Sequence, residues 1–233
     1  MDYHATILQW NCRSIVNKKS DLVYLINKYD PLIISLSETW LSPGIPFRIP
    51  GYTCLRKDRS DGYGGIATLI KNSVHFSSVP LPEFDDIPLL AISVNDICYV
   101  TTYIAHPSLE VFEKIKQILC TFPQQTLLMG DFNCNHQVWG SSVNSSYGEM
   151  LLDAIDQNNL CILNTGKPTR RTNPHENISA VDLSICSPNL ACSLSWDTLS
   201  LSYGSDHFPI LINFPNTVIK KNQKHHMIRP RYR

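Results

Sequence analysis

The sequence lacks any hydrophobic run that could cross a membrane, because no apolar stretch approaches the roughly 18 residues that a membrane-spanning helix needs. Its first residues, Met1-Asp2-Tyr3-His4, also lack the basic-then-apolar pattern of a secretory signal. Internal repeats and low-complexity segments are absent as well. We therefore expect a protein of the nucleus or cytoplasm, without a membrane partner.

Zinc-type cysteine spacing is missing too, although the sequence contains eight cysteines. No pair shows C-x2-C or C-x4-C spacing, and the nearest two, Cys186 and Cys192, have five residues between them. Several cysteines, such as Cys98, lie inside apolar runs. This pattern favours free, buried thiols in a reducing compartment over disulfides or a zinc site.

Net charge is zero, but this balance hides a split along the chain. Residues 1–214 carry 14 Lys/Arg against 20 Asp/Glu, whereas residues 215–233 carry six Lys/Arg and no Asp/Glu. An acidic body that acts on an anionic polymer needs a bound cation, local basic patches, or both. We expect one domain over residues 1–214, followed by a basic C-terminal tail or linker over residues 215–233.

Apolar periodicity predicts alternating strands and helices. The hydrophobic fraction is 43%, which is typical of a globular protein. Two strands joined by Asn95-Asp96 form a predicted hairpin, and Ser146 with Glu149 has the spacing of a helix-capping box. The predicted helices cover residues 18–29, 108–119 and 146–157, and the predicted strands cover 6–11, 32–37, 53–56, 65–70, 89–94, 97–104, 126–130, 160–163, 181–186 and 209–214. These counts indicate an α/β sandwich with two packed sheets and flanking helices.

Polar residues follow several of these buried strands. Asp131 and Asn133 end the run Leu127-Leu128-Met129-Gly130, and as residues two apart they are expected to point to the same side. Asn11 and Glu38 each end another strand. A hard divalent ion prefers oxygen ligands, which makes Glu38 our first candidate ligand. The alternative to a functional role is a structural one: Asp131 in an Asx turn, Asn11 as a turn residue, and Glu38 as an ordinary charged residue at the end of a strand.

A second cluster, Ser205-Asp206-His207, offers a side chain that titrates near neutral pH. Consecutive residues cannot form the hydrogen-bond chain of a catalytic triad, so His207 is predicted to bind phosphate or carry a proton. Its orienting carboxylate is predicted to be Asp182. Tyr103 could donate to a phosphate oxygen or belong to the core, and Arg170 and Arg171 suit phosphate contact or a solvated turn.

In this order, these residues together resemble the endonuclease/exonuclease/phosphatase superfamily. Within it, the chain is most similar to the apurinic-type endonuclease domain of non-LTR (LINE-type) retrotransposons. The resemblance spans roughly residues 5–214. It rests on Gln9-Trp10-Asn11-Cys12-Arg13-Ser14 with Asn17-Lys18, Glu38-Thr39-Trp40, Gly64-Gly65, Tyr103, Gly130-Asp131-Phe132-Asn133, Pro168-Thr169, Asp182 and Ser205-Asp206-His207.

The resemblance implies a four-layered α/β sandwich with two mainly antiparallel sheets. It also implies Mg²⁺-dependent, or Mn²⁺-dependent, cleavage of one strand of double-stranded DNA that leaves a 3′-hydroxyl to prime reverse transcription. By the same resemblance, Asn11 and Glu38 bind the metal ion, with Asp206 nearby. Tyr103 and His207 bind the scissile phosphate, and Asp182 orients His207. Asp131 and Asn133 act on the water or the leaving group, and the residues that contact substrate are Thr169, Ser205, Arg170 and Arg171.

One position departs from the repair enzymes of this superfamily, which carry a metal-side Asp where this chain has Arg13. This departure favours the retroelement branch, in which a reverse transcriptase domain and the element RNA are further expected partners. No reverse transcriptase follows the basic tail, so we expect a fragment, an excised domain or a degenerate copy, acting as a monomer. A phosphatase or RNA exonuclease of the same fold, and an inactive nucleic-acid-binding relic, are the alternative functions.

Overall fold

A computed structural model gives the fold, and it describes residues 5–60, 62–173, 175 and 177–214. The predicted basic tail, residues 215–233, lies outside the described residues. Among the described residues, no helix has both the length and the apolar character needed to span a bilayer.

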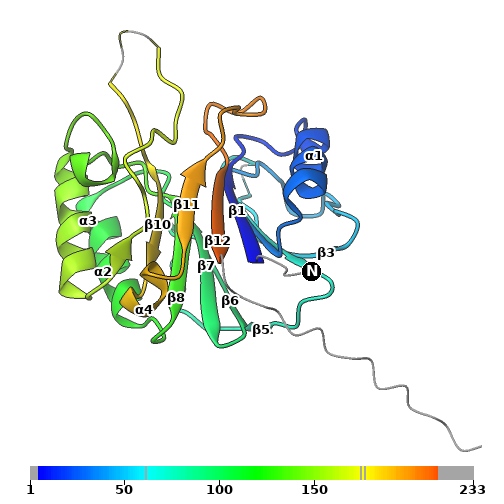
Figure 1. The fold of residues 1–233 in the computed structure, drawn as a ribbon, viewed down its shortest axis with the longest axis horizontal. Coiled ribbons are helices and arrows are strands. Elements are labelled where there is room, and N and C mark those ends of the chain that lie inside the picture. Colours follow the sequence, from blue (N-terminus) through cyan, green and yellow to red (C-terminus); the bar gives the residue numbers. More distant parts are fainter. Residues whose placement is uncertain (1–4, 61, 174, 176, 215–233) are drawn as a thin grey trace, which may run out of the picture.

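Twelve strands and four α-helices form the described part of the chain (Figure 1). The helices are α1 (Lys19–Tyr29), α2 (Leu109–Cys120), α3 (Ser146–Gln157) and the short α4 (Pro188–Ala191), with a 3₁₀ turn at Gln137–Trp139. The strands are β1 (Ala5–Asn11), β2 (Ile33–Ser37), β3 (Tyr52–Lys57), β4 (Ile66–Lys71), β5 (Ser77–Ser78), β6 (Leu89–Val94), β7 (Ile97–Tyr103), β8 (Thr126–Asp131), β9 (Cys161–Ile162), β10 (Asp182–Cys186), β11 (Ser195–Thr198) and β12 (Ile210–Phe214).

The strands form two six-stranded sheets, ordered β11-β12-β1-β2-β4-β3 and β5-β6-β7-β8-β10-β9. Each sheet contains one parallel pair, β1 with β2 and β7 with β8. The remaining neighbouring strands run antiparallel. The prediction of two packed, mainly antiparallel sheets is therefore confirmed.

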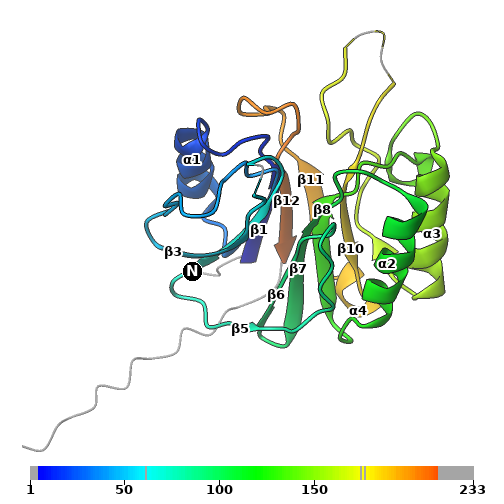
Figure 2. The same ribbon diagram turned by 180° about the vertical axis from the view of Figure 1, so that it is seen from behind.

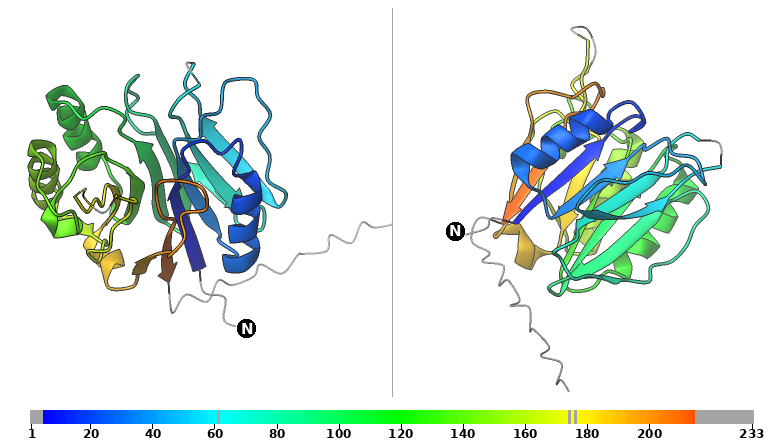
Figure 3. Two further views of the ribbon diagram at one scale, coloured as in Figure 1. Left: turned by 90° about the horizontal axis from the view of Figure 1, so that it is seen from above. Right: turned by 90° about the vertical axis from the view of Figure 1, so that its right-hand side faces the viewer.

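Four layers enclose three hydrophobic clusters. One cluster lies between the two sheets and includes Ile7, Met129 and Ile212. A second fills the space between the β5–β9 sheet and helices α2 and α3, and a third lies under α1. Seen from above, α2 and α3 cover one outer face and α1 covers the other (Figure 3). The sandwich is thus helix, sheet, sheet, helix, as predicted.

Buried hydrogen bonds also join the sheets. Gln9 on β1 donates to the carbonyl oxygens of Gly130 on β8 and Leu183 on β10, at 3.3 and 3.1 Å. Ser184 donates in turn to the side-chain oxygen of Gln9, at 2.7 Å. A buried amide that is fully bonded favours one relative placement of its partners, so Gln9 helps to fix the register between the two sheets.

Local sequence explains most element boundaries. The predicted Asn95-Asp96 turn is present, with both residues at positive φ, and Ser108 caps α2 by accepting from the Val111 amide. The predicted cap of α3 is wrong by one residue: Ser145 accepts from the Gly148 amide, and Ser146 is the first helical residue. Strand β5, strand β11 and helix α4 were not predicted.

All eight cysteines are free, as predicted. Four of them are buried (Cys12, Cys98, Cys134 and Cys186), while Cys120 and Cys192 are exposed. The prediction of buried thiols therefore holds for only part of the set.

Candidate active site

The predicted polar residues meet at one edge of the sandwich. Strands β1 and β2 run parallel and end together, with Asn11 opposite Ser37. In the other sheet, Asp131 on β8 stands opposite both Tyr103 on β7 and Asp182 on β10. Since both sheets present these ends at the same edge, residues far apart in the sequence become neighbours. This is the upper edge in Figure 1 and the face that looks toward the viewer in the left panel of Figure 3.

The centre of the site is a chain of three buried side chains. Nδ1 of His207 lies 2.7 Å from Oδ2 of Asp182, and Nε2 of His207 lies 3.9 Å from Oδ2 of Asp131. All three residues are less than 5% exposed. The predicted orientation of His207 by Asp182 is therefore present in the geometry.

This burial shapes the proton affinities of the centre. Burial lowers the pKa of His207, but the charge and hydrogen bond of Asp182, together with the charge of Asp131, outweigh it and raise this pKa to about 9. Burial and the charge of Asp182 raise the pKa of Asp131, against the opposing effect of His207. His207 is thus an imidazolium at neutral pH, and Asp131 is a carboxyl group able to exchange a proton there.

Asn11 connects this centre to Glu38. Its amide nitrogen donates to Oε1 of Glu38 at 2.9 Å and to Oδ2 of Asp131 at 2.8 Å. Its own side-chain oxygen accepts from the backbone amide of Arg13 at 3.0 Å. Trp40 donates through Nε1 to the other oxygen of Glu38 at 3.2 Å, a contact that the sequence did not predict. Both oxygens of Glu38 are therefore held in place.

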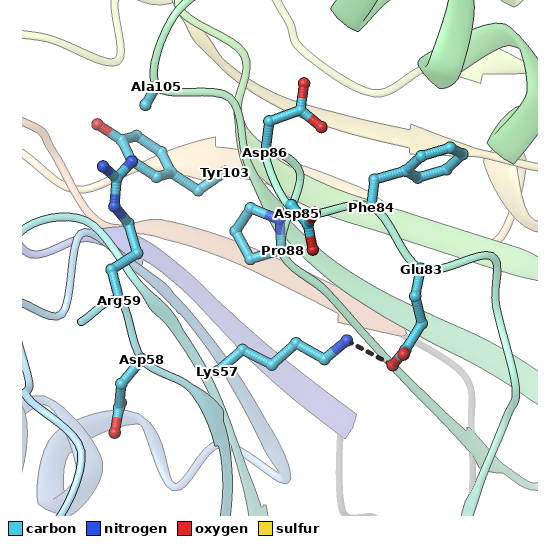
Figure 4. Close-up of a pocket in the computed structure, with 10 residues that line it drawn as sticks. All are labelled: Lys57, Asp58, Arg59, Glu83, Phe84, Asp85, Asp86, Pro88, Tyr103 and Ala105. Carbon is cyan, nitrogen blue, oxygen red and sulfur yellow. Dashed lines mark hydrogen bonds and ion pairs between the residues drawn. The ribbon is translucent and has the colours of Figure 1, made fainter. Parts of the chain in front are cut away.

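Tyr103 closes the Glu38 side of the site. Burial, followed by the charges of Glu38 and Asp131, raises its pKa, so the hydroxyl keeps its proton. Beside it lies a cavity of about 290 Å³, shown in Figure 4. Arg59 reaches into this cavity, and Figure 4 shows its guanidinium beside the hydroxyl end of Tyr103. The cavity flanks the centre; the Asp131–His207–Asp182 chain does not line it.

Asn133 reaches the site by a different route from the one predicted. Strand β8 ends at Asp131, and Asn133 has a positive φ of 48°, so strand alternation does not place its side chain. Instead, its backbone amide donates to Oδ1 of Asp131 at 2.8 Å, as in an Asx turn, and its side chain donates to the Ile104 carbonyl. The Asx turn and the active-site position therefore coexist.

Two residues predicted to contact substrate form buried hydrogen bonds that support the site. The hydroxyl oxygen of Thr169 accepts from the backbone amides of Val181 and Asp182, and Thr169 is fully buried. Ser205 donates to the Asn11 carbonyl at 2.8 Å and accepts from the His207 amide at 3.1 Å. Their contacts fix Asp182 and His207, and direct contact with substrate stays a prediction.

Asp206, the residue before His207, pairs with two arginines. Its Oδ2 is 3.1 Å from Nη1 of Arg13 and 3.4 Å from Nη2 of Arg170. Arg171 contributes through its backbone, whose amide donates to the Asp206 carbonyl at 2.7 Å. The metal role predicted for Asp206 stays a prediction.

Backbone conformation at this edge is unusual. Five non-glycine residues around the site have positive φ: Arg13, Ser14, Glu38, Trp40 and Asn133. Such conformations are costly for non-glycine residues and persist only where surrounding contacts hold them. Here the amides of Ser14 and Trp40 donate to the carbonyls of Glu38 and Gly64, respectively. These bonds place Glu38 at the end of β2 in a conformation that a regular strand would not give it.

The residues present fit a hard divalent cation. Glu38, Asp131 and Asp182 bring three carboxylates to one small region, against the single imidazolium of His207. Among the described residues, Oδ1 of Asp182 is buried without a hydrogen-bond partner. Ligand atoms of Asp131, Asp182 and His207 lie within 4.8 Å of one another, which makes this group a possible metal site. Because a protonated imidazole has no free lone pair, the oxygen atoms are the better ligands.

Comparison with known proteins supports the family suggested by the site. The protein family described as "Endonuclease-reverse transcriptase" matches residues 97–211. The RNA-directed DNA polymerase from mobile element jockey of Drosophila melanogaster is 26% identical over 222 residues, which are 92% of this chain. The match covers only 24% of that polymerase, so the chain spans about a quarter of its length.

Solved structures give the same fold. The endonuclease domain of TRAS1, a telomere-specific non-LTR retrotransposon, superposes with a TM-score of 0.76 at 21% identity, covering 91% of this chain and 98% of that domain. An AP endonuclease from Leishmania major has the same TM-score at 14% identity, covering 92% of this chain and 88% of that chain. The chain therefore has the endonuclease/exonuclease/phosphatase fold and matches the endonuclease domain of non-LTR retrotransposons.

Proposed function

We propose that this chain is a metal-dependent DNA endonuclease that nicks one strand of a duplex and leaves a 3′-hydroxyl and a 5′-phosphate. The observation that carries the proposal is the hydrogen-bonded series Glu38–Asn11–Asp131, continued by the buried pair of His207 and Asp182. This series joins the carboxylate of Glu38, the carboxyl group of Asp131, which can exchange a proton, and the imidazolium of His207 at one edge of the sandwich.

Each group has a role in hydrolysis. Asp182 holds His207 as an imidazolium, which donates to a non-bridging oxygen of the scissile phosphate and stabilises the charge that develops there. Tyr103 keeps its proton and is a second donor to the same phosphate. A divalent ion, Mg²⁺ or Mn²⁺, held by Glu38 with Asn11 and Asp131 nearby, would supply further charge stabilisation.

Proton transfer falls to Asp131. The oxygen of an attacking water forms a bond to phosphorus while the bond from phosphorus to the 3′ oxygen breaks. The water loses a proton and the 3′ oxygen gains one, so the group that mediates this exchange needs a proton affinity near neutrality. Burial and the charge of Asp182 raise the pKa of Asp131 in that direction. Asn133, held against Asp131 by its backbone amide, is positioned to orient the water.

A duplex substrate is favoured over a small phosphoester by the shape of this edge. The described parts of the segment between β9 and β10, residues 163–173 and 177–181, are yellow in Figures 1 and 2 and rise above the other loops of the same edge. Loops that protrude at the rim suit a large ligand better than a closed pocket would.

The test is plasmid nicking by the purified chain, with Mg²⁺ and with EDTA. We expect supercoiled plasmid to become open circle only with the metal, and Glu38→Ala and His207→Ala to lose at least 100-fold in rate, in the range for lost electrostatic catalysis, ~10²–10³. His75→Ala is the matched control, because His75 is exposed just before β5, away from the cluster. Nicking that persists in EDTA or in both variants would contradict the proposal.

A further inference from the structure

Two arginines share one carboxylate at the rim of the site. Arg13 follows β1, Arg170 lies between β9 and β10, and Asp206 precedes β12, so three distant segments contribute. Oδ2 of Asp206 lies 3.1 Å from Arg13 and 3.4 Å from Arg170. A single carboxylate neutralises only one guanidinium, which leaves the group with a net positive charge beside an otherwise acidic centre.

The backbone of each arginine is anchored while its charged end is accessible. The Arg13 amide donates to Asn11, and the Arg13 carbonyl accepts from Nζ of Lys18 at 2.6 Å. Arg170 forms isolated β-bridges with Ser179 and with His207. Nevertheless, the side chains of Arg13 and Arg170 are 55% and 48% exposed. Both guanidiniums are thus held beside Asp206, the residue before His207, and are about half exposed.

Such an arrangement suits exchange of one anion for another. The guanidinium ends of these pairs are about half exposed and contribute little to stability, so a phosphate can replace the Asp206 carboxylate, itself 23% exposed, at modest cost. The guanidinium fork matches a phosphate at least as well as a carboxylate, and two forks can hold one phosphate from both sides. The same two arginines offset the repulsion between a polyanion and the carboxylates of the centre.

We propose that Arg13 and Arg170 form a clamp for a DNA backbone phosphate beside the bond that is cut, and that Asp206 holds the clamp until DNA displaces its carboxylate. Asp206 is then an anchor for the two guanidiniums. The clamp rests on the proposed function, because it takes duplex DNA as the substrate. It adds Arg13 to the substrate-binding residues and makes Asp206 a competitor of the substrate.

The clamp can be tested by binding without cleavage. A fluorescently labelled duplex is titrated with the full chain in EDTA, and affinity is measured by anisotropy at several NaCl concentrations. We expect Arg13→Ala and Arg170→Ala each to weaken binding about five- to tenfold at 0.1 M salt. Each should also lower the slope of log affinity against log salt by about 1, the loss of one phosphate contact.

Asp206→Asn gives the sharper test. Without the competing negative charge, the two guanidiniums are free for phosphate, so binding should tighten several-fold. Arg13→Lys keeps the charge but loses the fork, and should keep the salt slope while losing part of the affinity. The matched control is Lys116→Ala on α2, which pairs with Glu113 on the outer helical layer and should bind as the wild type does.

Several results would overturn the clamp. They are arginine variants that bind with wild-type affinity and slope, an Asp206→Asn variant that binds more weakly, or a wild-type chain that does not bind duplex DNA. Thermal melting of each variant shows that an affinity loss does not come from unfolding. The proposed function is tested separately: a chain that binds through Arg13 but never nicks contradicts the endonuclease and leaves the clamp standing.

Discussion

Replacing Asp182 by asparagine should convert His207 from a cation to a neutral ring at physiological pH. Asp182 contributes the largest of the effects that raise the pKa of His207, through its charge and its 2.7 Å hydrogen bond. The ordinary pKa of 6.5 becomes about 9 in the folded protein. At 1.36 kcal/mol for each pH unit, this difference corresponds to roughly 3 kcal/mol of favourable interaction with the imidazolium.

The substitution keeps the hydrogen bond and removes the largest effect that raises the pKa of His207, which leaves burial opposed by the charges of Asp131 and Asp206. In Asp182→Asn we therefore expect this pKa to fall from about 9 toward the ordinary 6.5. Nicking at pH 7.5 should then drop at least ~10-fold, because most of the imidazolium that stabilises the phosphate is absent, and the loss approaches ~10²–10³ where the imidazolium is absent altogether. The assay for the ring itself is NMR of the histidine nitrogens of the metal-free protein between pH 5 and 10.

The ion pair of His207 with Asp182 also leads to a prediction about the pH dependence of stability. Because the pKa of His207 is raised on folding, its contribution to stability is complete below about pH 6.5 and is lost as the pH rises through about 9. Urea unfolding of the metal-free wild type should therefore show a decline across this range, which Asp182→Asn should lack. A His207 ring that titrates at the same pH in the variant and in the wild type would refute the reasoning.

Three further predictions concern the support of the site. Asn11→Ala removes the hydrogen-bond donors to Glu38 and Asp131 and should lower the free energy of unfolding in urea by about 3 kcal/mol, at roughly 1.5 kcal/mol for each charge-assisted bond. A decrease below about 1 kcal/mol would contradict the bridging role of Asn11. Gly130→Ala places a Cβ 2.4 Å from the Thr102 carbonyl oxygen, so it should destabilise the protein by about 2 kcal/mol or more and lower the melting temperature. An unchanged melting temperature would show that β7 and β8 are less tightly packed than this distance indicates. Mg²⁺ should raise the melting temperature of the wild type by mass action and raise that of Glu38→Ala less, whereas equal shifts would place the ion elsewhere.

Sequence periodicity predicted the long elements because their burial pattern is regular. Strands β1, β2 and β8 are buried at every position, and each contains a group of consecutive large apolar residues. The short elements escaped prediction for the opposite reason. Strand β11, Ser-Trp-Asp-Thr, buries only Trp196, and β5 consists of two exposed serines. Such strands form because a neighbouring strand offers backbone partners, and that information is not local.

The site could be assembled only in part from the sequence. Polar residues at the ends of buried strands identified Asn11, Glu38, Asp131 and Asp182, since sheet geometry brings strand ends together. The contacts of Arg13 with Asp206 and of Trp40 with Glu38 have no local pattern. A substrate contact of Thr169 stays a prediction from the resemblance, and no local pattern indicated that its buried hydroxyl oxygen accepts from the backbone of β10. The position at which a strand ends can be predicted from the local sequence. The direction of a side chain beyond that end depends on tertiary contacts, which the local sequence does not contain.

The composition of the site also explains why it needs so rigid a frame. Burying Asp131 and Asp182 on neighbouring strands of one sheet costs free energy, and one imidazolium cannot offset two carboxylates together with Glu38. The cost is tolerated because two six-stranded sheets, tied by Gln9 and by the amide of Asn11, prevent the edge from opening to solvate the charges. A cation and a phosphate bound together would restore the charge balance. The excess of negative charge that destabilises the free protein would therefore favour binding of a divalent ion, and under the proposed function the arginines at the rim would attract the phosphate beside it.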